Sequence, residues 1–333
     1  LHDFVYVPLR GDVFVGGCVF RCSVWAMAVA TPLSFKQNFS GVKKMVYREI
    51  AKNVEEDVAR ALAEDVGSGD LTAALIDAAS TAHATIICRD EAVICGQPWV
   101  TEVLRQIVPD ALVTWHVQDG EPCQRNQKIV EVFGSSRQLL TAERVCLNFL
   151  QTLSAVATKT NQYVNAVKGT KASILDTRKT IPGLRVAQKY AVRCGGGKNH
   201  RMGLYDAILI KENHIAAAGG LAAAFRAAQQ LSDKVEFIQV EVETLSQLDE
   251  ALTAGVTMVL LDNMTLEMVR SAVALTQGRA SLEISGGVQF ENLRELAETG
   301  VDRISVGGLI KDIKAVDFSM RFLKDAVDPV GKD

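Results

Sequence analysis

The stretch IQVEVETLSQLDEALTAGVTMVLLDN, residues 238–263, contains one β/α repeat and the strand that begins the next. Its two ends, IQVEVE and MVLLDN, are short apolar runs rich in valine, isoleucine and leucine, which favours buried strands. The segment between them, SQLDEALTAG, has helical spacing of its apolar residues and ends at Gly255, a residue type that commonly terminates helices. The order of strand, amphipathic helix and strand predicts a parallel sheet built from β/α units.

Similar apolar runs recur through the second half of the chain. They are SILDT from Ser173, AILIK from Ala207, IQVEVE from Ile238, MVLLDN from Met258, LEISGG from Leu282 and RISVGG from Arg303. From the second run onward they are about 20–30 residues apart, which is the period of a β/α unit. The glycines of CGGGKNH, from Cys194, do not form a G-x-G-x-x-G fingerprint and follow no predicted strand. Six units without that fingerprint favour an α/β barrel over an open doubly wound sheet.

The first half of the chain has a different pattern. Residues 46–65, 97–109 and 137–167 have the apolar spacing of helices. Four β-like runs separated by Gly and Asp-Gly turns lie between the first and the last of these helices: ATIICRD from Ala84, AVICG from Ala92, LVTWHV from Leu112 and KIVEVFG from Lys128. The pattern predicts an α+β domain with an open sheet, joined to the second half by the longest helix.

Composition excludes several classes of protein. A hydrophobic content of 48% and a charged content of 23% are typical of a globular protein, and 333 residues are enough for two domains. The net charge of −3 argues against general nucleic-acid binding. Seven cysteines without a C-x-x-C pair argue against a zinc site or a disulfide framework, and they fit a reducing cytoplasm. The apolar residues 16–32 are interrupted by Arg21 and are too few to span a membrane.

The first 44 residues differ in pattern from the rest, and we expect them to be an extension outside the folded core, with translation beginning at Met45. A secretory signal peptide is the alternative interpretation of this segment. The other predicted divisions are an N-terminal domain over residues 45–147, a barrel domain over residues 148–312 and a tail over residues 313–333.

Positive charge is concentrated in residues 176–214, DTRKTIPGLRVAQKYAVRCGGGKNHRMGLYDAILIKENH, which contain eight lysines or arginines against three acids. Charged residues and glycine pairs also end the predicted strands: Asp176-Thr177 with Arg178-Lys179, Lys211, Glu241 with Glu243, Asp262, Ser285-Gly286-Gly287 and Gly307-Gly308. Because α/β barrels build their active sites at the carboxyl ends of the strands, we expect these residues to form one site.

These residue types suit a substrate with several negative charges. Arginine and lysine bind carboxylates and phosphates, and glycine turns at helix starts let a phosphate approach backbone N–H groups. Glu241 and Asp262 would hold Mg²⁺ against a pyrophosphate or stabilise a developing cation. For other polar residues we expect a structural role instead of a substrate contact. Arg185, Lys189 and Arg193 would form the solvated face of a helix, His214 would contact backbone, and Asp206 would cap a turn.

Several motifs together resemble the quinolinate phosphoribosyltransferases, also called nicotinate-nucleotide pyrophosphorylases (carboxylating). They are AERVCLNFLQTLSAVAT, LDTRKTIPGLRVAQKYAVRCGGGKNHRMGLYDAILIKENHI, VEVETLSQLDEAL, LLDNMTLEMV, LEISGGV and GVDRISVGGL, in the order and spacing of that family. The resemblance covers residues 46–325. It implies a cytoplasmic enzyme of NAD biosynthesis that converts quinolinate and phosphoribosyl pyrophosphate, with Mg²⁺, into nicotinate mononucleotide, pyrophosphate and CO₂.

The resemblance also implies an architecture and an assembly. The expected fold is an N-terminal open α/β sandwich domain followed by an incomplete or atypical α/β barrel, with the C-terminal tail packed on the first domain. The expected assembly is a homodimer or a dimer-based hexamer with shared active sites, without nucleic acid or membrane.

Site residues follow from the resemblance position by position. Those expected to bind quinolinate are Arg144, supplied by the neighbouring subunit, with Arg178, His200 and Arg201. Those expected to be catalytic are Lys179, Lys211, Glu241 and Asp262, the two acids also holding the metal directly or through substrate or water. Those expected to bind the phosphate are Ser285, Gly286, Gly287, Gly307, Gly308 and Lys311.

Three alternatives remain open from the residues. The chain could be a phosphoribosyltransferase for another pyridine carboxylate such as nicotinate, although a monocarboxylate needs fewer cations. It could be a barrel aldolase or isomerase that uses Lys211 as a Schiff base. It could also be a metabolite sensor without turnover, although two acids at the site disfavour a purely anionic ligand.

Overall fold

The computed structural model describes residues 41–323, with side chains from Ile50 onward. The chain divides between Lys44 and Met45, and the description below is that of the unit from Met45 onward. Most of the predicted extension, residues 1–40, and the end of the predicted tail, residues 324–333, lie outside the described residues.

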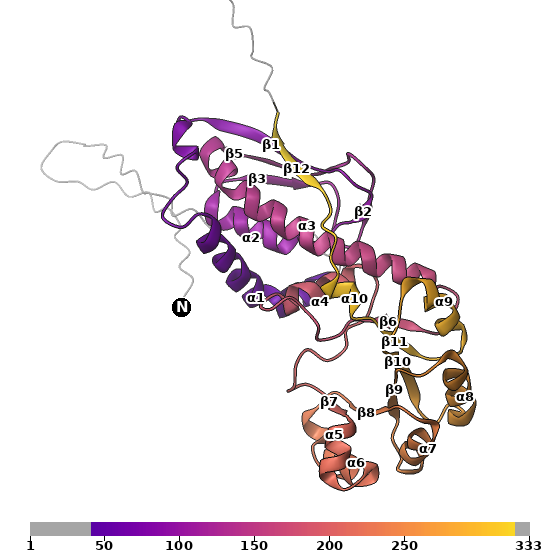
Figure 1. Ribbon diagram of the computed structural model, residues 1–333. Helices are drawn as coiled ribbons and strands as arrows, with labels where there is room; N and C mark the ends of the chain where they lie inside the picture. Colours follow the sequence, from indigo (N-terminus) through magenta and orange to yellow (C-terminus); the bar gives the residue numbers. More distant parts are fainter. Residues whose placement is uncertain (1–40, 324–333) are drawn as a thin grey trace, which may run out of the picture. The chain divides into compact units, whose positions relative to one another are not determined.

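The N-terminal part is an antiparallel sheet with helices on one side, which confirms the predicted open α+β arrangement (Figure 1). The sheet has the order β12-β1-β5-β3, and its strands are Phe318–Phe322, Thr81–Cys88, Lys128–Ser135 and Leu112–Trp115. A separate pair joins β2 (Ala92–Val93) to β4 (Pro122–Cys123). The helical elements here are α1 (Gly41–Asp65), η1 (Ala73–Leu75) and α2 (Gln97–Ile107).

The edge strand β12 comes from the far end of the chain. It pairs antiparallel with β1, from Ala84 opposite Phe322 to Cys88 opposite Phe318. Val316 and Phe318 are buried. Residues of the predicted tail therefore complete the N-terminal sheet.

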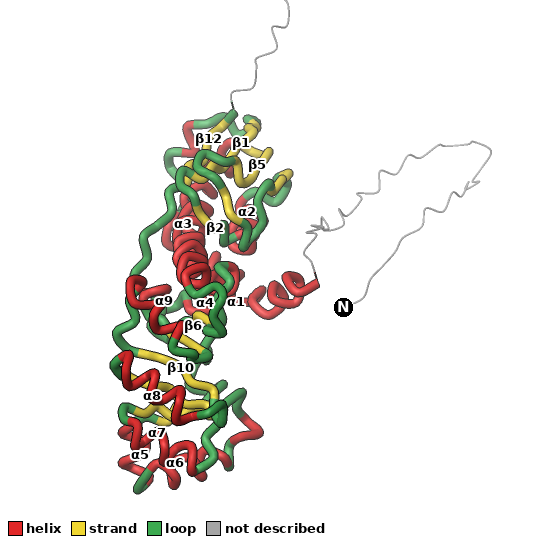
Figure 2. The backbone as a smooth tube through the Cα atoms, turned by 90° about the vertical axis from the view of Figure 1, so that its right-hand side faces the viewer, coloured by secondary structure: helices red, strands yellow, loops and turns green. Residues whose placement is uncertain are grey.

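The helix α3 (Ser136–Ala166) runs from the N-terminal sheet to the C-terminal one, and its bounds are within one residue of the prediction. It packs against α2 on one side and against α4 (Arg185–Cys194) on another (Figure 2). The predicted domain boundary between residues 147 and 148 falls inside this continuous helix.

The C-terminal part is a six-stranded parallel sheet in the order β6-β11-β10-β9-β8-β7. These strands are Ser173–Leu175, Arg303–Ser305, Ser281–Ser285, Met258–Asp262, Ile238–Val242 and Ile208–Ile210. Each lies in one of the six predicted runs, except that β10 begins one residue earlier, at Ser281. Lys198, which lies in the chain between β6 and β7, forms an isolated parallel bridge with Leu175 of β6. The barrel is therefore incomplete, as predicted, with a short irregular segment beside β6.

Short helices alternate with these strands. They are α5 (Glu212–Ala218), α6 (Leu221–Gln229), η2 (Ser232–Lys234), α7 (Leu245–Thr253), α8 (Leu266–Thr276), α9 (Phe290–Glu298) and α10 (Gly308–Lys311). Buried leucines and alanines such as Leu248 and Ala251 of α7 form the face that packs on the sheet. Among the helices of residues 41–323, none is long and apolar enough to cross a membrane.

Candidate active site

The carboxyl ends of β7 and β8 bring Lys211 and Glu241 together. Lys211 Nζ lies 2.9 Å from Oε1 and 2.6 Å from Oε2 of Glu241, so the ammonium donates to both carboxylate oxygens. Glu241 is 8% exposed, whereas the side chain of Lys211 is 44% exposed. Because Nζ contacts both oxygens of Glu241, it is not free to attack a carbonyl group, which disfavours the Schiff-base alternative.

The glycine turns after β10 and β11 form one cavity of about 260 Å³. It is lined by all six residues predicted for the phosphate, which are Ser285, Gly286, Gly287, Gly307, Gly308 and Lys311. Lys179, from the loop after β6, also lines it. So does Lys159 of α3, whose Nζ donates to the carbonyls of Gly308 at 2.8 Å and Asp312 at 3.0 Å. Lysines and glycine backbone around one space suit a phosphate group.

Gly286 shows why a glycine is needed in this cavity. Its φ of +84° lies in the left-handed region. A Cβ at this position would also collide with the side chain of Asn263. Asn263 Nδ2 in turn donates to Oδ2 of Asp262 at 2.9 Å, so the turn packs directly beside the end of β9.

Asp176, at the end of β6, joins the two segments that carry the predicted quinolinate residues. It is fully buried, and its Oδ1 accepts from Lys189 Nζ and from the backbone N–H of His200. Its Oδ2 accepts from Asn199 Nδ2 at 2.5 Å. Burial raises the pKa of Asp176 and lowers that of Lys189, while the attraction between the two charges opposes both shifts.

His200 is buried and both of its ring nitrogens contact protein groups. Nδ1 accepts from the backbone N–H of Arg201 at 2.8 Å, so the neutral ring carries its proton on Nε2. Nε2 lies 3.0 Å from Oε1 of Gln239 and 3.5 Å from Oε1 of Glu283. Burial lowers the pKa of His200, and the Glu283 carboxylate opposes that shift. This geometry favours the uncharged ring.

Glu283 belongs to a buried polar layer inside the sheet. Its Oε2 accepts from Arg303 Nε at 2.7 Å and from Gln239 Nε2 at 3.2 Å. Arg303 also lies 5.9 Å above the ring of Phe237. Gln239 and Glu283 contact Nε2 of His200, and Arg303 holds Glu283, so this layer fixes the orientation of the ring.

Arg178 and Arg201 place two guanidinium groups close together. Burial lowers the pKa of Arg201, and the positive charge of Arg178 lowers it further. Arg201 Nη1 donates to the carbonyl of Ala207 at 3.2 Å, which anchors the side chain. Two neighbouring cations match a ligand that carries two neighbouring carboxylates.

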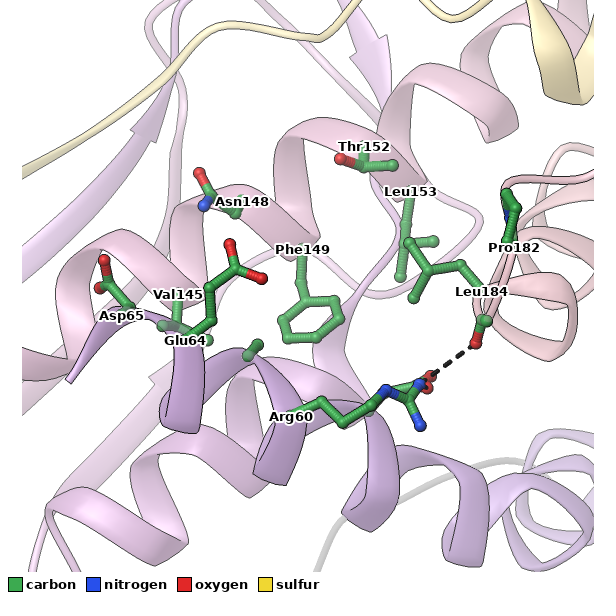
Figure 3. Close-up of a pocket in the computed structure, with 13 residues that line it drawn as sticks. Arg60, Glu64, Asp65, Val145, Asn148, Phe149, Thr152, Leu153, Pro182 and Leu184 are labelled. Carbon is green, nitrogen blue, oxygen red and sulfur yellow. Dashed lines mark hydrogen bonds and ion pairs between the residues drawn. The ribbon is translucent and has the colours of Figure 1, made fainter. Parts of the chain in front are cut away.

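Arg144 has a different environment from the other predicted quinolinate residues. It is exposed on α3, and within residues 41–323 it forms no hydrogen bond or ion pair with any of them. The next residue, Val145, lines the cavity of about 330 Å³ that Figure 3 shows between α1, α3 and the loop at Pro182–Leu184. None of the predicted substrate residues lines that cavity.

Of the structural roles predicted from the sequence, those of His214 and Asp206 are confirmed and that of Lys189 is wrong. His214 was predicted to contact backbone, and its Nδ1 accepts from the N–H of Lys211 at 3.0 Å. Asp206 was predicted to cap a turn, and it accepts from two backbone N–H groups, including that of Gly203 at 2.8 Å. Both interpretations are confirmed. The solvated face predicted for α4 is wrong at Lys189, which is 1% exposed because it pairs with Asp176 beneath the site.

The family assignment rests on both parts of the chain. Residues 70–154 match the family model described as quinolinate phosphoribosyl transferase, N-terminal domain, and residues 156–321 match the one described as quinolinate phosphoribosyl transferase, C-terminal domain. The chain belongs to the quinolinate phosphoribosyltransferase family.

Relatives of this family match most of the chain. The probable nicotinate-nucleotide pyrophosphorylase (carboxylating) of Bacillus subtilis (strain 168) is 40% identical over 257 residues, which is 77% of this chain and 89% of the relative. That of Mycobacterium leprae (strain TN) is 41% identical over 272 residues, which is 80% and 95%. A solved structure of the nicotinate-nucleotide pyrophosphorylase from Francisella tularensis is 45% identical, with a TM-score of 0.80 over 82% of this chain and 97% of that one.

Several site residues of this family member were missed in its sequence. Lys159 lines the cavity at the glycine turns, Lys189, Gln239 and Glu283 contact His200, and Arg303 pairs with Glu283. The available signal was alternation, because Gln239 and Glu283 lie two residues before Glu241 and Ser285 on the same strands. Side chains two apart on a strand point the same way.

One further group of potential metal ligands lies in the described part of the chain, away from the predicted site residues. The ligand atoms of Cys95, Asp119 and Cys194 all lie within 4.8 Å of one another. Asp119 Oδ1 accepts from the backbone N–H of Gly96 at 3.0 Å, and its Oδ2 accepts from Tyr190 OH at 2.9 Å. Because the carboxylate already joins the start of α2 to α4, a structural role explains this group.

Proposed function

We propose that this chain transfers the phosphoribosyl group of phosphoribosyl pyrophosphate to quinolinate with decarboxylation. The products are nicotinate mononucleotide, pyrophosphate and CO₂, and the reaction supplies NAD biosynthesis. Family membership supports this function over both parts of the chain. The sequence resemblance and the solved relative support the same assignment.

The observation that carries the proposal is the placement of two kinds of anion site at one end of the sheet. Arg178 and Arg201 offer paired guanidinium groups from segments beside β6. The cavity with Lys179 and the glycines after β10 and β11 offers a site for the sugar phosphate. Quinolinate has two adjacent carboxylates, and phosphoribosyl pyrophosphate has a 5′-phosphate and a pyrophosphate, so the two ligands match the two sites.

The first chemical step is displacement at the anomeric carbon of the ribose. The quinolinate nitrogen supplies the electron pair that forms the new C–N bond, and the C–O bond to pyrophosphate breaks with its electrons on the leaving group. Arg178 and Arg201 orient the ring, which supplies proximity without a general base. Glu241 faces the positive charge that develops on the sugar, and Lys179 and Lys211 offset negative charge on the phosphates.

The second step is loss of CO₂ from the ring carbon next to the nitrogen. Alkylation makes the nitrogen a pyridinium. When the C–C bond to the carboxylate breaks, its electron pair stays on the ring carbon, where the adjacent positive nitrogen stabilises it. The resulting carbanion then takes a proton from water. The substrate itself provides the electron sink, so the residues at this site bind and orient rather than form a covalent intermediate.

Mg²⁺ fits the donor set of the site. Glu241 already has Lys211 Nζ on both oxygens, whereas within residues 41–323 the Asp262 carboxylate accepts a side-chain hydrogen bond only from the Asn263 amide. Mg²⁺ in enzymes commonly takes one or two carboxylates and completes its shell with substrate phosphates and water. When bound, the ion would neutralise the leaving pyrophosphate, with Asp262 as its main protein ligand and Glu241 beside it.

A homodimer, or a hexamer built from dimers, would complete the site. Arg144 lies exposed on α3 and contacts none of the other quinolinate residues of its own chain within residues 41–323. We propose that it reaches the quinolinate of the neighbouring subunit. His200 would line the same pocket as a neutral residue.

The test is a turnover assay with quinolinate, phosphoribosyl pyrophosphate and Mg²⁺ that follows nicotinate mononucleotide and CO₂ together. Nicotinate is the parallel substrate. Glu241→Ala protein, purified in the same way, controls for an enzyme carried over from the expression host. Equal amounts of both products from quinolinate, and none with the variant, would support the proposal. Product from nicotinate alone, or binding without product, would contradict it.

A further inference from the structure

The two proposed quinolinate arginines lie on separate segments of the chain. Arg178 is in the loop that precedes α4, and Arg201 is in the segment that follows it. The positive charge of Arg178 acts on Arg201, since it adds to the lowering of the Arg201 pKa that burial causes. Like charges repel, so a contact that joins the two segments would help to set the distance between the two guanidinium groups.

Arg185, the first residue of α4, contacts both segments at once. Its Nη2 donates to the backbone carbonyl of Arg178 at 3.2 Å, and its Nε donates to Oγ1 of Thr180 at 3.1 Å. Its Nη1 donates to the backbone carbonyl of Met202 at 3.0 Å. Thus one planar group joins the backbone beside Arg178 to the backbone beside Arg201.

The acceptors show what Arg185 does chemically. All three are neutral oxygens of the protein, and they lie around the guanidinium in directions that its fork of N–H groups can serve together. A lysine ammonium at this position is a single point donor and cannot reach the three acceptors in the same geometry. The charge of Arg185 is therefore used to hold the protein, not to bind substrate.

The next turn of α4 attaches the second segment again. Lys189 Nζ donates to the backbone carbonyl of His200 at 2.7 Å and pairs with Asp176. Lys189 reaches the segment after α4 and the end of β6, whereas Arg185 is the residue that contacts the Arg178 loop and the Arg201 segment with one side chain.

We propose that Arg185 is a positioning residue that fixes the separation of Arg178 and Arg201 for a ligand with two adjacent carboxylates. This inference rests on the proposed function, because it takes quinolinate as that ligand. Arg185 acts through the two substrate arginines, so its loss should affect quinolinate much more than phosphoribosyl pyrophosphate.

The experiment compares Arg185→Lys and Arg185→Ala with wild-type protein and with Arg226→Ala, an exposed arginine of α6. KM is measured for each substrate with the other saturating, together with the midpoint of thermal unfolding. We expect both Arg185 variants to raise the KM for quinolinate about 10- to 100-fold, as misplaced binding groups do, with the KM for phosphoribosyl pyrophosphate changed less than about threefold. Arg226→Ala should match the wild type. Added guanidinium should lower the quinolinate KM of Arg185→Ala but not of Arg185→Lys.

Arg185→Lys keeps the charge, so it separates the fork geometry from electrostatics and remains informative if Arg185→Ala folds poorly. A wild-type quinolinate KM in Arg185→Lys would overturn the inference, and so would equal increases of both KM values in the two variants. If wild-type protein turns over quinolinate, such results refute only the role of Arg185. If wild-type protein does not turn it over, the proposed function falls and this inference falls with it.

Discussion

Lys211 Nζ lies within hydrogen-bonding distance of both carboxylate oxygens of Glu241, at 2.9 and 2.6 Å. The pair joins the ends of two neighbouring parallel strands, β7 and β8. It places a buried carboxylate at the carboxyl end of the sheet, where several predicted site residues are cations. A carboxylate in that place suits a cation that forms only in the transition state.

Replacement of Glu241 by Gln should therefore lower kcat with little change in the KM for quinolinate. Loss of a preorganised charge at a reacting centre commonly costs about 100-fold or more in kcat. Steady-state kinetics with both substrates measures the effect. Glu243→Gln is the matched control, because Glu243 is exposed two residues further along the chain. Unchanged kcat in Glu241→Gln would remove this residue from the mechanism.

Arg201→Ala should weaken quinolinate binding selectively. The guanidinium is anchored to Ala207 O and lies near Arg178, so its removal takes away one of the two paired cations. Hydrogen bonds to charged groups are worth about 1.5–3 kcal/mol, which corresponds to roughly 10- to 150-fold in KM. The KM for phosphoribosyl pyrophosphate should change much less. Equal loss for both substrates would contradict the proposed role.

The buried pair of Lys189 and Asp176 should be important for stability. Lys189→Ala leaves Asp176 buried without its cation, and breaking a buried pair on one side commonly costs about 3–5 kcal/mol. Urea unfolding measures the free energy. The double variant Lys189→Met with Asp176→Asn should lose less than the sum of the single changes. Lys52→Ala, which breaks an ion pair with Glu56 on the exposed face of α1, should cost less than about 1 kcal/mol.

The strand pattern and the strand-ending residues could be predicted from the sequence because both follow from periodicity. Alternating apolar runs and helical segments specify β/α units, and the carboxyl ends of parallel strands meet at one edge. Lys189 could not be predicted in this way. A lysine at helical spacing from Arg185 and Arg193 has the pattern of a solvated face, and only the buried partner Asp176 reverses that interpretation.

The buried layer of Gln239, Glu283 and Arg303 was missed for a related reason. A charged residue within a short apolar strand gives no sign of whether a partner on the next strand will pair with it. The position of β12 in the sheet could not be predicted from the strand pattern for a different reason, which is the distance along the chain. Its pairing with β1 joins residues more than 200 positions apart, and sequence periodicity carries no information about such a contact.

The stability of the protein should fall with pH below about 6.5 partly because of His200, whose folded-state pKa is depressed from the usual value of 6.5 by burial. The unfolded chain then binds a proton more readily than the folded one, so this contribution is present above 6.5 and is lost as the pH falls toward the folded pKa. The groups that act on the ring are the carboxylate of Glu283, the amide of Gln239 and the cations of Arg303 and Lys189. The carboxylate of Asp176 accepts from the backbone N–H of His200.

The measurement is urea unfolding of wild-type and His200→Gln protein between pH 5 and pH 8. The variant should show a shallower loss of stability on the acid side, because it has no imidazole to protonate. His83→Gln, at a partly exposed histidine of β1, is the control and should keep more of the wild-type slope. Parallel curves for wild type and His200→Gln would show that the acid sensitivity comes from other groups.

Shared active sites can be tested with two inactive variants. Arg144→Ala removes the exposed arginine of α3, and Glu241→Ala removes the carboxylate at the end of β8; each should be nearly inactive alone. If Arg144 serves the neighbouring subunit, a mixed dimer contains one site that lacks both residues and one site that is intact. Mixed dimers purified with two different tags should therefore recover about half of the wild-type activity per dimer, following the arithmetic of independent sites.

Mixing Glu241→Ala with Lys211→Ala is the matched control, because these two residues contact each other within one chain. That pair places one defect in each site and should recover no more than the single variants. Verified mixed dimers of the first pair that remain inactive would mean that each site is made by a single chain.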